Sequence, residues 1–334
     1  MKKQAIKPAR YFSNQMLADA RQRGDQLADI CIQSVFEQVG MTGLRTFFQW
    51  LVKEDFDWKS QLDFVQKYFQ DNAVFPSFYQ EKQFQKGLDF AQKHQADIAL
   101  MLGCLSLPYC YAGADGAKVL WMSERIGKDT QKRLEETGNF VFGVLNPKQW
   151  KSSEAGIPIA MLRILKVRLM HASIRFFTLY HQTWDTKALG FPVNQEDMAG
   201  TNLAFSYIVI VGLRKNNLSI SDENAEDYLH TWNTINALMG VEIELLPQNL
   251  REAFVLAKAI AKRQFRTSEE GINLTKALLK VLERFIDNPL LKPIPSAFMR
   301  HLLGKEVADL LQIPNNPLEE RLVPFIPVKA VFGF

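Results

Sequence analysis

The chain has 334 residues, of which 47% are hydrophobic and 23% are charged. This balance is typical of a globular protein and excludes a disordered chain, a collagen and a coiled-coil rod. The 40 Lys and Arg residues exceed the 36 Asp and Glu residues by only four charges, which argues against nucleic acid as a partner, since that function usually requires a strongly basic surface.

The spacing of apolar residues predicts helices along most of the chain. The first two are expected over Gln26–Gln38 and Asp57–Gln70, where apolar side chains recur every three or four residues. A long helix is expected over Pro158–Gln182, because proline is tolerated in a first helical turn. Four further helices are expected to begin at residues that can cap or open a helix, namely Asn194, Ser221, Pro247 and Ser268.

Alternating strand patterns are scarce, and no linker or change of composition divides the chain. No internal repeat is visible either. We therefore predict an all-α fold in which residues 1–334 form a single large helical domain. The proline-containing residues 314–334 are expected to form an irregular carboxy-terminal tail.

The amino-terminal segment is positively charged, but no apolar run follows it, so the sequence predicts no secretory signal. The most apolar window, Leu203–Leu213, is far shorter than the roughly 20 residues that a membrane-spanning helix needs. Three cysteines are too few for a disulfide framework and fit a reducing compartment. We expect a cytoplasmic protein with no transmembrane segment.

A histidine between two cations is the most informative feature of the sequence. Within KVRLMHASIRFF, Arg168, His171 and Arg175 are spaced i, i+3 and i+7 and share one face of the predicted helix. A neutral imidazole binds iron, and arginines pair with carboxylates such as haem propionates. The spacing alone leaves open a core histidine whose neighbouring arginines extend to solvent.

Two other stretches allow a functional and a structural interpretation. In KRLEETGNF, Arg133, Glu136 and Thr137 share a helix face, which by itself also fits a solvated charged helix. In FPVNQEDMAGTNLAFS, Gly200 lies inside a predicted helix, where glycine costs about 1 kcal/mol relative to alanine. Close packing of a flat partner explains this glycine, and so does a helix–helix crossing.

These stretches follow one another in the order found in a known family. RLEETGNFVFGVL, KVRLMHASIR, PVNQEDMAGTNLAFS and YLHTWNTINALMGVEIELLP together resemble the latex clearing protein (rubber oxygenase) and MpaB-type oxygenase family. The resemblance is strongest over residues 105–247, with a weaker echo over 301–314. It implies an all-α protein with a globin-like core that holds one haem b. It also implies dioxygen-dependent cleavage of a carbon–carbon double bond in an isoprenoid chain.

The resemblance also implies roles for individual residues. His171 corresponds to the proximal iron ligand, and Arg133 and Thr137 correspond to distal residues that orient dioxygen. The other cofactor-binding residues are expected to be Arg168, Arg175, Gly200 and Thr201.

The sequence departs from the rubber-cleaving pattern on the distal side. Glu136 stands where those enzymes can carry an iron-capping lysine, and we expect it to act as the catalytic base rather than to cap the iron. Other candidates for this base are Glu124, Glu135 and Asp115. Rubber-cleaving members are secreted, so a chain without an export signal is expected to act on a small or membrane-derived unsaturated lipid. Two alternatives remain, a haem protein with a peroxidase-like or gas-sensing role and a non-catalytic helical module that binds lipid or protein.

Overall fold

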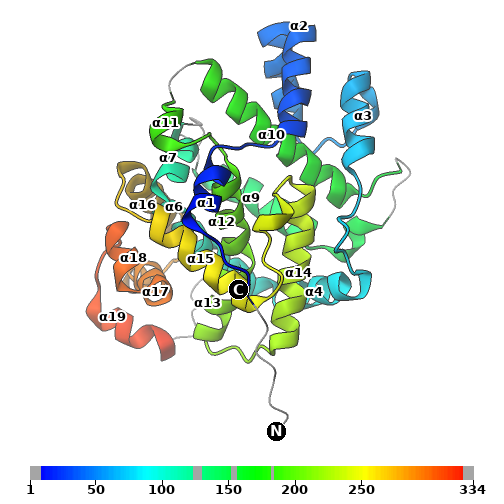
Figure 1. The fold of residues 1–334 in the computed structure, drawn as a ribbon. Helices are drawn as coiled ribbons and strands as arrows, with labels where there is room; N and C mark the ends of the chain where they lie inside the picture. The colour runs from blue at the N-terminus through cyan, green and yellow to red at the C-terminus, as the bar shows by residue number, and fades with distance from the viewer. Residues whose placement is uncertain (1–8, 123–129, 152–155, 182–183, 326–334) are drawn as a thin grey trace.

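The computed structural model describes residues 9–122, 130–151, 156–181 and 184–325, and within these ranges it contains helices and no β-strand (Figure 1). The all-α prediction is therefore confirmed. The α-helices are α1 (Asn14–Arg21), α2 (Gln26–Val52), α3 (Asp63–Asn72), α4 (Glu81–Lys93), α5 (Gln95–Met101), α6 (Leu107–Ala112), α7 (Ala114–Met122), α9 (Thr130–Val144), α10 (Ile159–Tyr180), α11 (Thr186–Leu189), α12 (Gln195–Phe205), α13 (Tyr207–Lys215), α14 (Asp222–Leu238), α15 (Leu250–Gln264), α16 (Glu269–Arg284), α17 (Ile294–Leu303), α18 (Lys305–Leu310) and α19 (Pro317–Leu322).

Three of the predicted helix starts are confirmed by their caps. The side chains of Asn194, Ser221 and Ser268 each accept a hydrogen bond from the backbone N–H three residues further on, at 2.9, 3.2 and 3.0 Å. The helix expected from Pro247 begins instead at α15, because the side chain of Asn249 accepts from two backbone N–H groups there. Polar side chains near each predicted start therefore determine where these helices begin.

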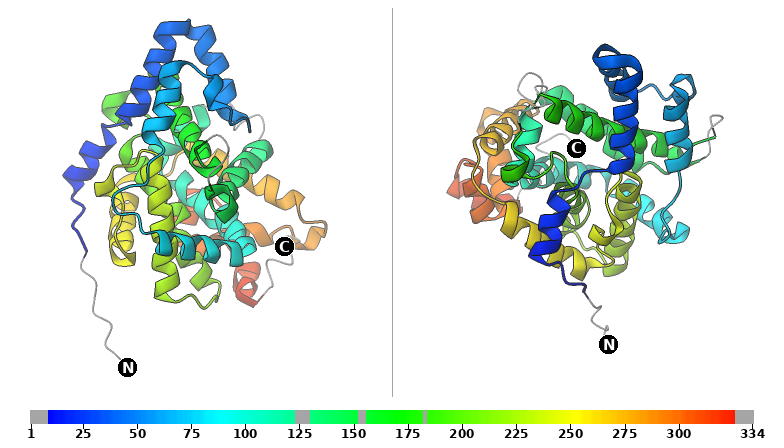
Figure 2. Two further views of the ribbon diagram at one scale, coloured as in Figure 1. Left: turned by 90° about the vertical axis from the view of Figure 1, so that its right-hand side faces the viewer. Right: turned by 45° about the horizontal axis from the view of Figure 1, so that its top comes forward.

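Two of the predicted helices differ in extent from the structure. Helix α2 continues well past Gln38 to Val52, but Gly40 interrupts it with a φ of 65° and a ψ of −173°. The kinked helix stands out at the top of the molecule (Figure 2). The helix predicted over Asp57–Gln70 is split into a 3-10 turn, Trp58–Ser60, and α3.

Helix α10 is packed between several others, so its residues can face more than one environment. It contacts α2, α9 and α14, and Figure 2 shows α2 crossing it. Most of the described helices contribute to one large hydrophobic cluster, whereas residues of α1, α12 and α15 form much of a second. Helices α9, α10 and α12, which carry most of the predicted site residues, are therefore held by two adjoining packed regions.

The carboxy-terminal tail is more regular than the sequence predicts. Residues 317–322 form α19, followed by a 3-10 turn over Val323–Phe325, and α19 packs against α17. Proline at the first position of a helix is compatible with helical geometry, which explains how Pro317 opens this element. The expectation for residues 326–334 lies outside the described residues. In the part of the chain that the structure describes, no helix is long and apolar enough to cross a bilayer.

Candidate functional site

His171 lies in the middle of α10 with its ring half-buried. Its Nδ1 atom is buried and has no hydrogen-bond partner among the residues that the structure describes. Burial, followed by the positive charges of Arg175 and Arg133, lowers the pKa of His171 to about 4, which the carboxylate of Asp25 only partly offsets. The imidazole is therefore neutral near neutral pH, which is the form that binds a metal.

The surroundings of His171 fit an iron that arrives with its own ligands. Among the described residues, no group of three or more His, Cys, Asp or Glu side chains could hold a metal ion. A single neutral histidine whose Nδ1 has no partner among the described residues is able to ligate a metal whose other ligands come from a cofactor, as in a porphyrin. Nη2 of Arg175 is buried and has no partner among the described residues either, so it can donate to a cofactor carboxylate.

The two arginines that flank His171 both turn toward the start of α2. Every guanidinium nitrogen of Arg168 donates within the protein, to Asp25, to Asn72 and to the carbonyl of Leu238. Arg175 donates to Asp29 through Nε at 2.7 Å and to the carbonyl of Val193 through Nη1 at 3.1 Å. Of these two arginines, only Arg175 has a guanidinium nitrogen with no acceptor among the described residues, and this nitrogen could donate to a propionate.

Helix α9 contributes the predicted distal residues, and α9 packs against α10. Arg133 is half-buried and close enough to contribute to the lowered pKa of His171 and to offset in part the rise that burial causes in the pKa of Tyr111. The Thr137 hydroxyl donates to the backbone carbonyl of Arg133 at 2.9 Å. Glu136 is half-buried beside them. Arg133 of α9 and His171 of α10 are therefore close enough to interact electrostatically.

The candidate bases have very different surroundings. Glu135 is exposed and accepts a hydrogen bond from Gln131 at 3.2 Å. Asp115 is buried and paired with Arg21 and Arg266. Glu124 lies outside the described residues. Glu136 is half-buried. It differs from Glu135, which is exposed, and from Asp115, whose charge is neutralised by two arginines.

Helix α12 places Gly200 and Thr201 in different settings. A Cβ at Gly200 would lie 3.4 Å from Ile260 of α15, so this glycine serves a helix–helix crossing, one of the two interpretations that the sequence allows. Thr201 is exposed, and its hydroxyl donates to the carbonyl of Asp197 at 2.9 Å. Burial raises the pKa of Cys110 to about 12, and hydrogen bonding to Thr201 lowers it in part, so Thr201 lies beside α6.

The acidic residues that precede Gly200 form a buried ionic cluster. Arg21 donates to Asp197 at 2.9 Å, to Glu196 at 3.3 Å and to Asp115 at 2.9 Å. Arg263 also donates to Glu196, at 2.6 Å. These bonds join α1, α7, α12 and α15, so this part of the motif holds helices together.

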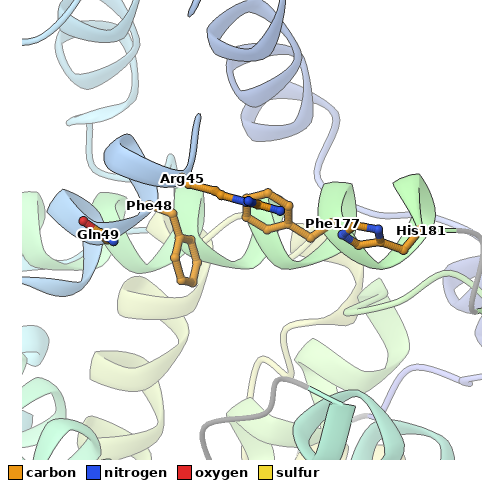
Figure 3. Close-up of a pocket in the computed structure, with 5 residues that line it drawn as sticks. All are labelled: Arg45, Phe48, Gln49, Phe177 and His181. Carbon is orange, nitrogen blue, oxygen red and sulfur yellow. The ribbon is translucent and has the colours of Figure 1, made fainter. Parts of the chain in front are cut away.

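Two cavities lie along α10. One of about 350 Å³ is lined by the five side chains that Figure 3 shows, Arg45, Phe48, Gln49, Phe177 and His181. It contains none of the predicted site residues. A larger groove of about 840 Å³ runs between the start of α2 and α10, and Arg175, Asp25 and Asp29 are among the residues that line it.

Sequence reasoning missed the acidic partners of the two arginines. Asp25 and Asp29 are four residues apart on α2, and Arg168 and Arg175 are seven apart on α10, so each pair shares a helix face. The spacing was a usable signal within each helix. Only the packing of α2 on α10 shows that the two faces meet.

Comparisons with known proteins agree with the all-α fold. A family model described as "ER-bound oxygenase mpaB/B'/Rubber oxygenase, catalytic domain" matches residues 95–331. A rubber oxygenase from Streptomyces sp. (strain K30) is 24% identical over 250 residues, which cover 74% of this chain and 60% of that protein. The solved structure of a latex clearing protein in the closed state superposes with a TM-score of 0.78 at 20% identity, covering 95% of this chain and 84% of the other.

Proposed function

Because the chain belongs to the mpaB/B' and rubber oxygenase catalytic-domain family, we propose that it is a haem b-dependent oxygenase that uses dioxygen on an unsaturated hydrophobic substrate. The chain spans only 60% of the length of the rubber oxygenase that it resembles, so the activity of that protein is carried over as part of the proposal. The observation that supports it best is His171, a neutral imidazole on a packed helix, within electrostatic reach of Arg133 on α9.

Haem b, when bound, supplies an iron centre able to activate dioxygen. His171 would hold the iron, and Nη2 of Arg175 would donate to a propionate. Thr201, which is exposed on α12, would border the cofactor, whereas Gly200 packs against Ile260 of α15. Arg168 supports the site indirectly, since its guanidinium is already bound by Asp25, Asn72 and Leu238.

On α9, Arg133 would orient dioxygen and stabilise negative charge that develops on it. The Thr137 hydroxyl has its proton bonded to the Arg133 carbonyl, so its oxygen is available as an acceptor. Thr137 can donate toward dioxygen only by giving up that bond. Glu136 accepts a proton from the substrate.

The family to which the chain belongs supports a proposal for the substrate class. A rubber oxygenase acts, by its name, on a polyisoprene, and we propose that this chain takes a smaller or membrane-derived isoprenoid or another unsaturated lipid. Oxidative cleavage of its double bond would give carbonyl products.

The visible absorption spectrum of the purified full chain, before and after haem is supplied, tests the proposal. We expect one haem per chain and oxygen-dependent loss of an isoprenoid double bond. His171→Ala should fold but lose most of the haem, whereas His181→Ala, an exposed histidine at the end of the same helix, should keep it.

Three results would count against this function. A folded chain that stays colourless with added haem would point to the non-catalytic module. Peroxide-driven oxidation without dioxygen-dependent cleavage would favour the peroxidase-like role. An unchanged spectrum and full haem content in His171→Ala would remove His171 as the ligand.

A further inference from the structure

Two ion pairs fasten the helix of His171 to the start of α2. Arg168 Nη2 donates to Asp25 Oδ1 at 2.9 Å, and Arg175 Nε donates to Asp29 Oδ1 at 2.7 Å. Arg168 precedes His171 by three residues and Arg175 follows it by four, so the pairs bracket it on both sides along α10. Asp25 is also the N-cap of α2, accepting from the Ala28 backbone N–H. We call these two ion pairs the clamp.

The clamp is shielded from solvent. The side chains of Arg168 and Asp25 are 9% and 6% exposed, and that of Arg175 is 2% exposed. Asp29 is the more open member at 31%. Charges in such surroundings interact more strongly than at a surface, so removing one member of a pair leaves a field that solvent screens poorly.

Two glycines press their backbone onto the clamp. A Cβ at Gly240 would lie 2.2 Å from Asp25 Oδ2 and 2.7 Å from Arg168 Nε. A Cβ at Gly24 would lie 2.9 Å from Asp29 Oδ2 and 3.0 Å from Arg175 Nε. Each ion pair therefore has its own glycine, and any side chain at either position would displace it.

One buried amide ties the two glycines together. Nε2 of Gln195, which is 2% exposed, donates to the carbonyls of Gly24 and Gly240, at 2.9 Å in both cases. Its Oε1 accepts from the backbone N–H of Glu242 at 2.9 Å. The first turn of α12 is thereby joined to both covers of the clamp.

From this geometry we propose that Asp25, Asp29 and Gln195 are positioning residues for His171. The two aspartates neutralise the arginines on either side of the imidazole and hold α10 in register on α2, and Gln195 fixes the backbone that covers them. They act through α10 and touch neither cofactor nor substrate. The inference rests on the proposed role of His171 as the iron ligand.

A positioning role and simple helix packing predict changes in different measured quantities. A packing contact changes stability and haem content, whereas a positioning residue also changes the iron–histidine bond and the electrostatic field at the iron. Loss of Asp29 removes a negative charge from beside Arg175, about one turn from His171, and so makes the field there more positive. That field favours the reduced, less positive iron and should raise its midpoint potential.

The test compares Asp29→Asn with Glu54→Gln in the full chain. Glu54 forms a control ion pair with Arg163 of α10, whose Nη2 lies 2.8 Å from Glu54 Oε2, eight residues before His171. In the haem-loaded proteins, the midpoint potential and the iron–histidine stretching band should shift in Asp29→Asn and stay unchanged in Glu54→Gln. Asp29→Glu, which restores the charge, should return both values toward those of the parent chain.

Asp25→Asn is the more severe variant, and Asp29→Asn keeps the inference testable if the former fails to fold. Lower melting temperatures with an unshifted potential and band in Asp29→Asn would overturn the positioning role. If the parent chain binds no haem, the proposed function fails on its own. The clamp is then judged from the imidazole NMR signals of His171 in the haem-free chain, which should move in Asp29→Asn but not in Glu54→Gln. Signals unmoved in both would overturn it.

Discussion

At the scale of single residues, the positive charge of Arg133 acts on His171 and is proposed to act on dioxygen as well. Arg133 helps to keep the imidazole of His171 unprotonated, because a second positive charge nearby is unfavourable. A guanidinium is also suited to stabilise negative charge on an oxygen atom. One side chain can therefore protect the metal-binding form of the histidine and assist the reaction.

We expect Arg133→Ala to lower oxygen-dependent turnover by about 100-fold, the magnitude typical of losing one preorganised donor. Thr137→Val should have a smaller effect, since its hydroxyl proton is bonded to the helix backbone. Haem content and melting temperature should stay near those of the parent chain, and Gln131→Ala, an exposed residue of α9, provides the control. A variant that melts far earlier while keeping its activity per folded molecule would mean that these residues are structural.

Glu136 should leave the distal side open to small ligands. A carboxylate is a hard, anionic ligand and a poor substitute for a neutral amine at ferrous iron. We therefore expect carbon monoxide to bind the reduced, haem-loaded chain in a single fast phase in stopped-flow mixing. A slow phase that disappears in Glu136→Ala would show that this carboxylate caps the iron, and one that persists would indicate another distal ligand.

At the scale of elements, the turn after α14 matters because it touches the clamp. Gly240 combines a φ of +89° with the close approach to Asp25, whereas Gly304 has a φ of +82° and nothing within 4 Å of a Cβ. The two glycines share a positive φ and differ in crowding. Comparing them separates backbone strain from the displacement of an ion pair.

We expect Gly304→Ala to lower the free energy of unfolding by about 1–3 kcal/mol, because its φ of 82° and ψ of 162° lie in a region that is open essentially only to glycine. Gly240→Ala should cost about 3 kcal/mol or more, because overpacking against Asp25 adds to that strain. Chemical denaturation of both variants measures the difference. Equal losses would show that the approach of Gly240 to the clamp relaxes without consequence.

At the scale of the whole molecule, the buried ionic cluster links segments that lie far apart along the chain. Arg21 comes from α1, Asp115 from α7, Glu196 and Asp197 from α12, and Arg263 from α15. Removing one member of such a cluster leaves buried charges without compensation. The amino-terminal helix is thereby essential to the arrangement around α12.

Arg21→Ala should therefore lower the free energy of unfolding by about 3–5 kcal/mol. Lys67→Ala removes an exposed pair with Asp71 on α3, whose side chains are 72% and 55% exposed, and should change stability by less than about 1 kcal/mol. Urea unfolding of both variants tests this. A loss in Arg21→Ala no larger than in Lys67→Ala would mean that the cluster contributes little to stability.

The helical class, most helix starts and the segments proposed to carry the site were predictable from the amino-acid sequence. These features depend on the local spacing of apolar residues, on capping side chains such as Asn194, and on short sequence motifs. The single domain, the globin-like core and the cytoplasmic location stay predictions. So do the roles of the individual site residues.

The contacts between those segments were visible only in the folded structure. There, Asp25 and Asp29 form ion pairs with the arginines beside His171, the acidic residues of α12 pair with Arg21, and Gly200 lies at a helix crossing. The physical reason is that each partner lies far away in sequence, so periodicity identifies a helix face but not the face that it meets. Ion pairs and close backbone approaches exist only once α2, α10 and α12 have packed together.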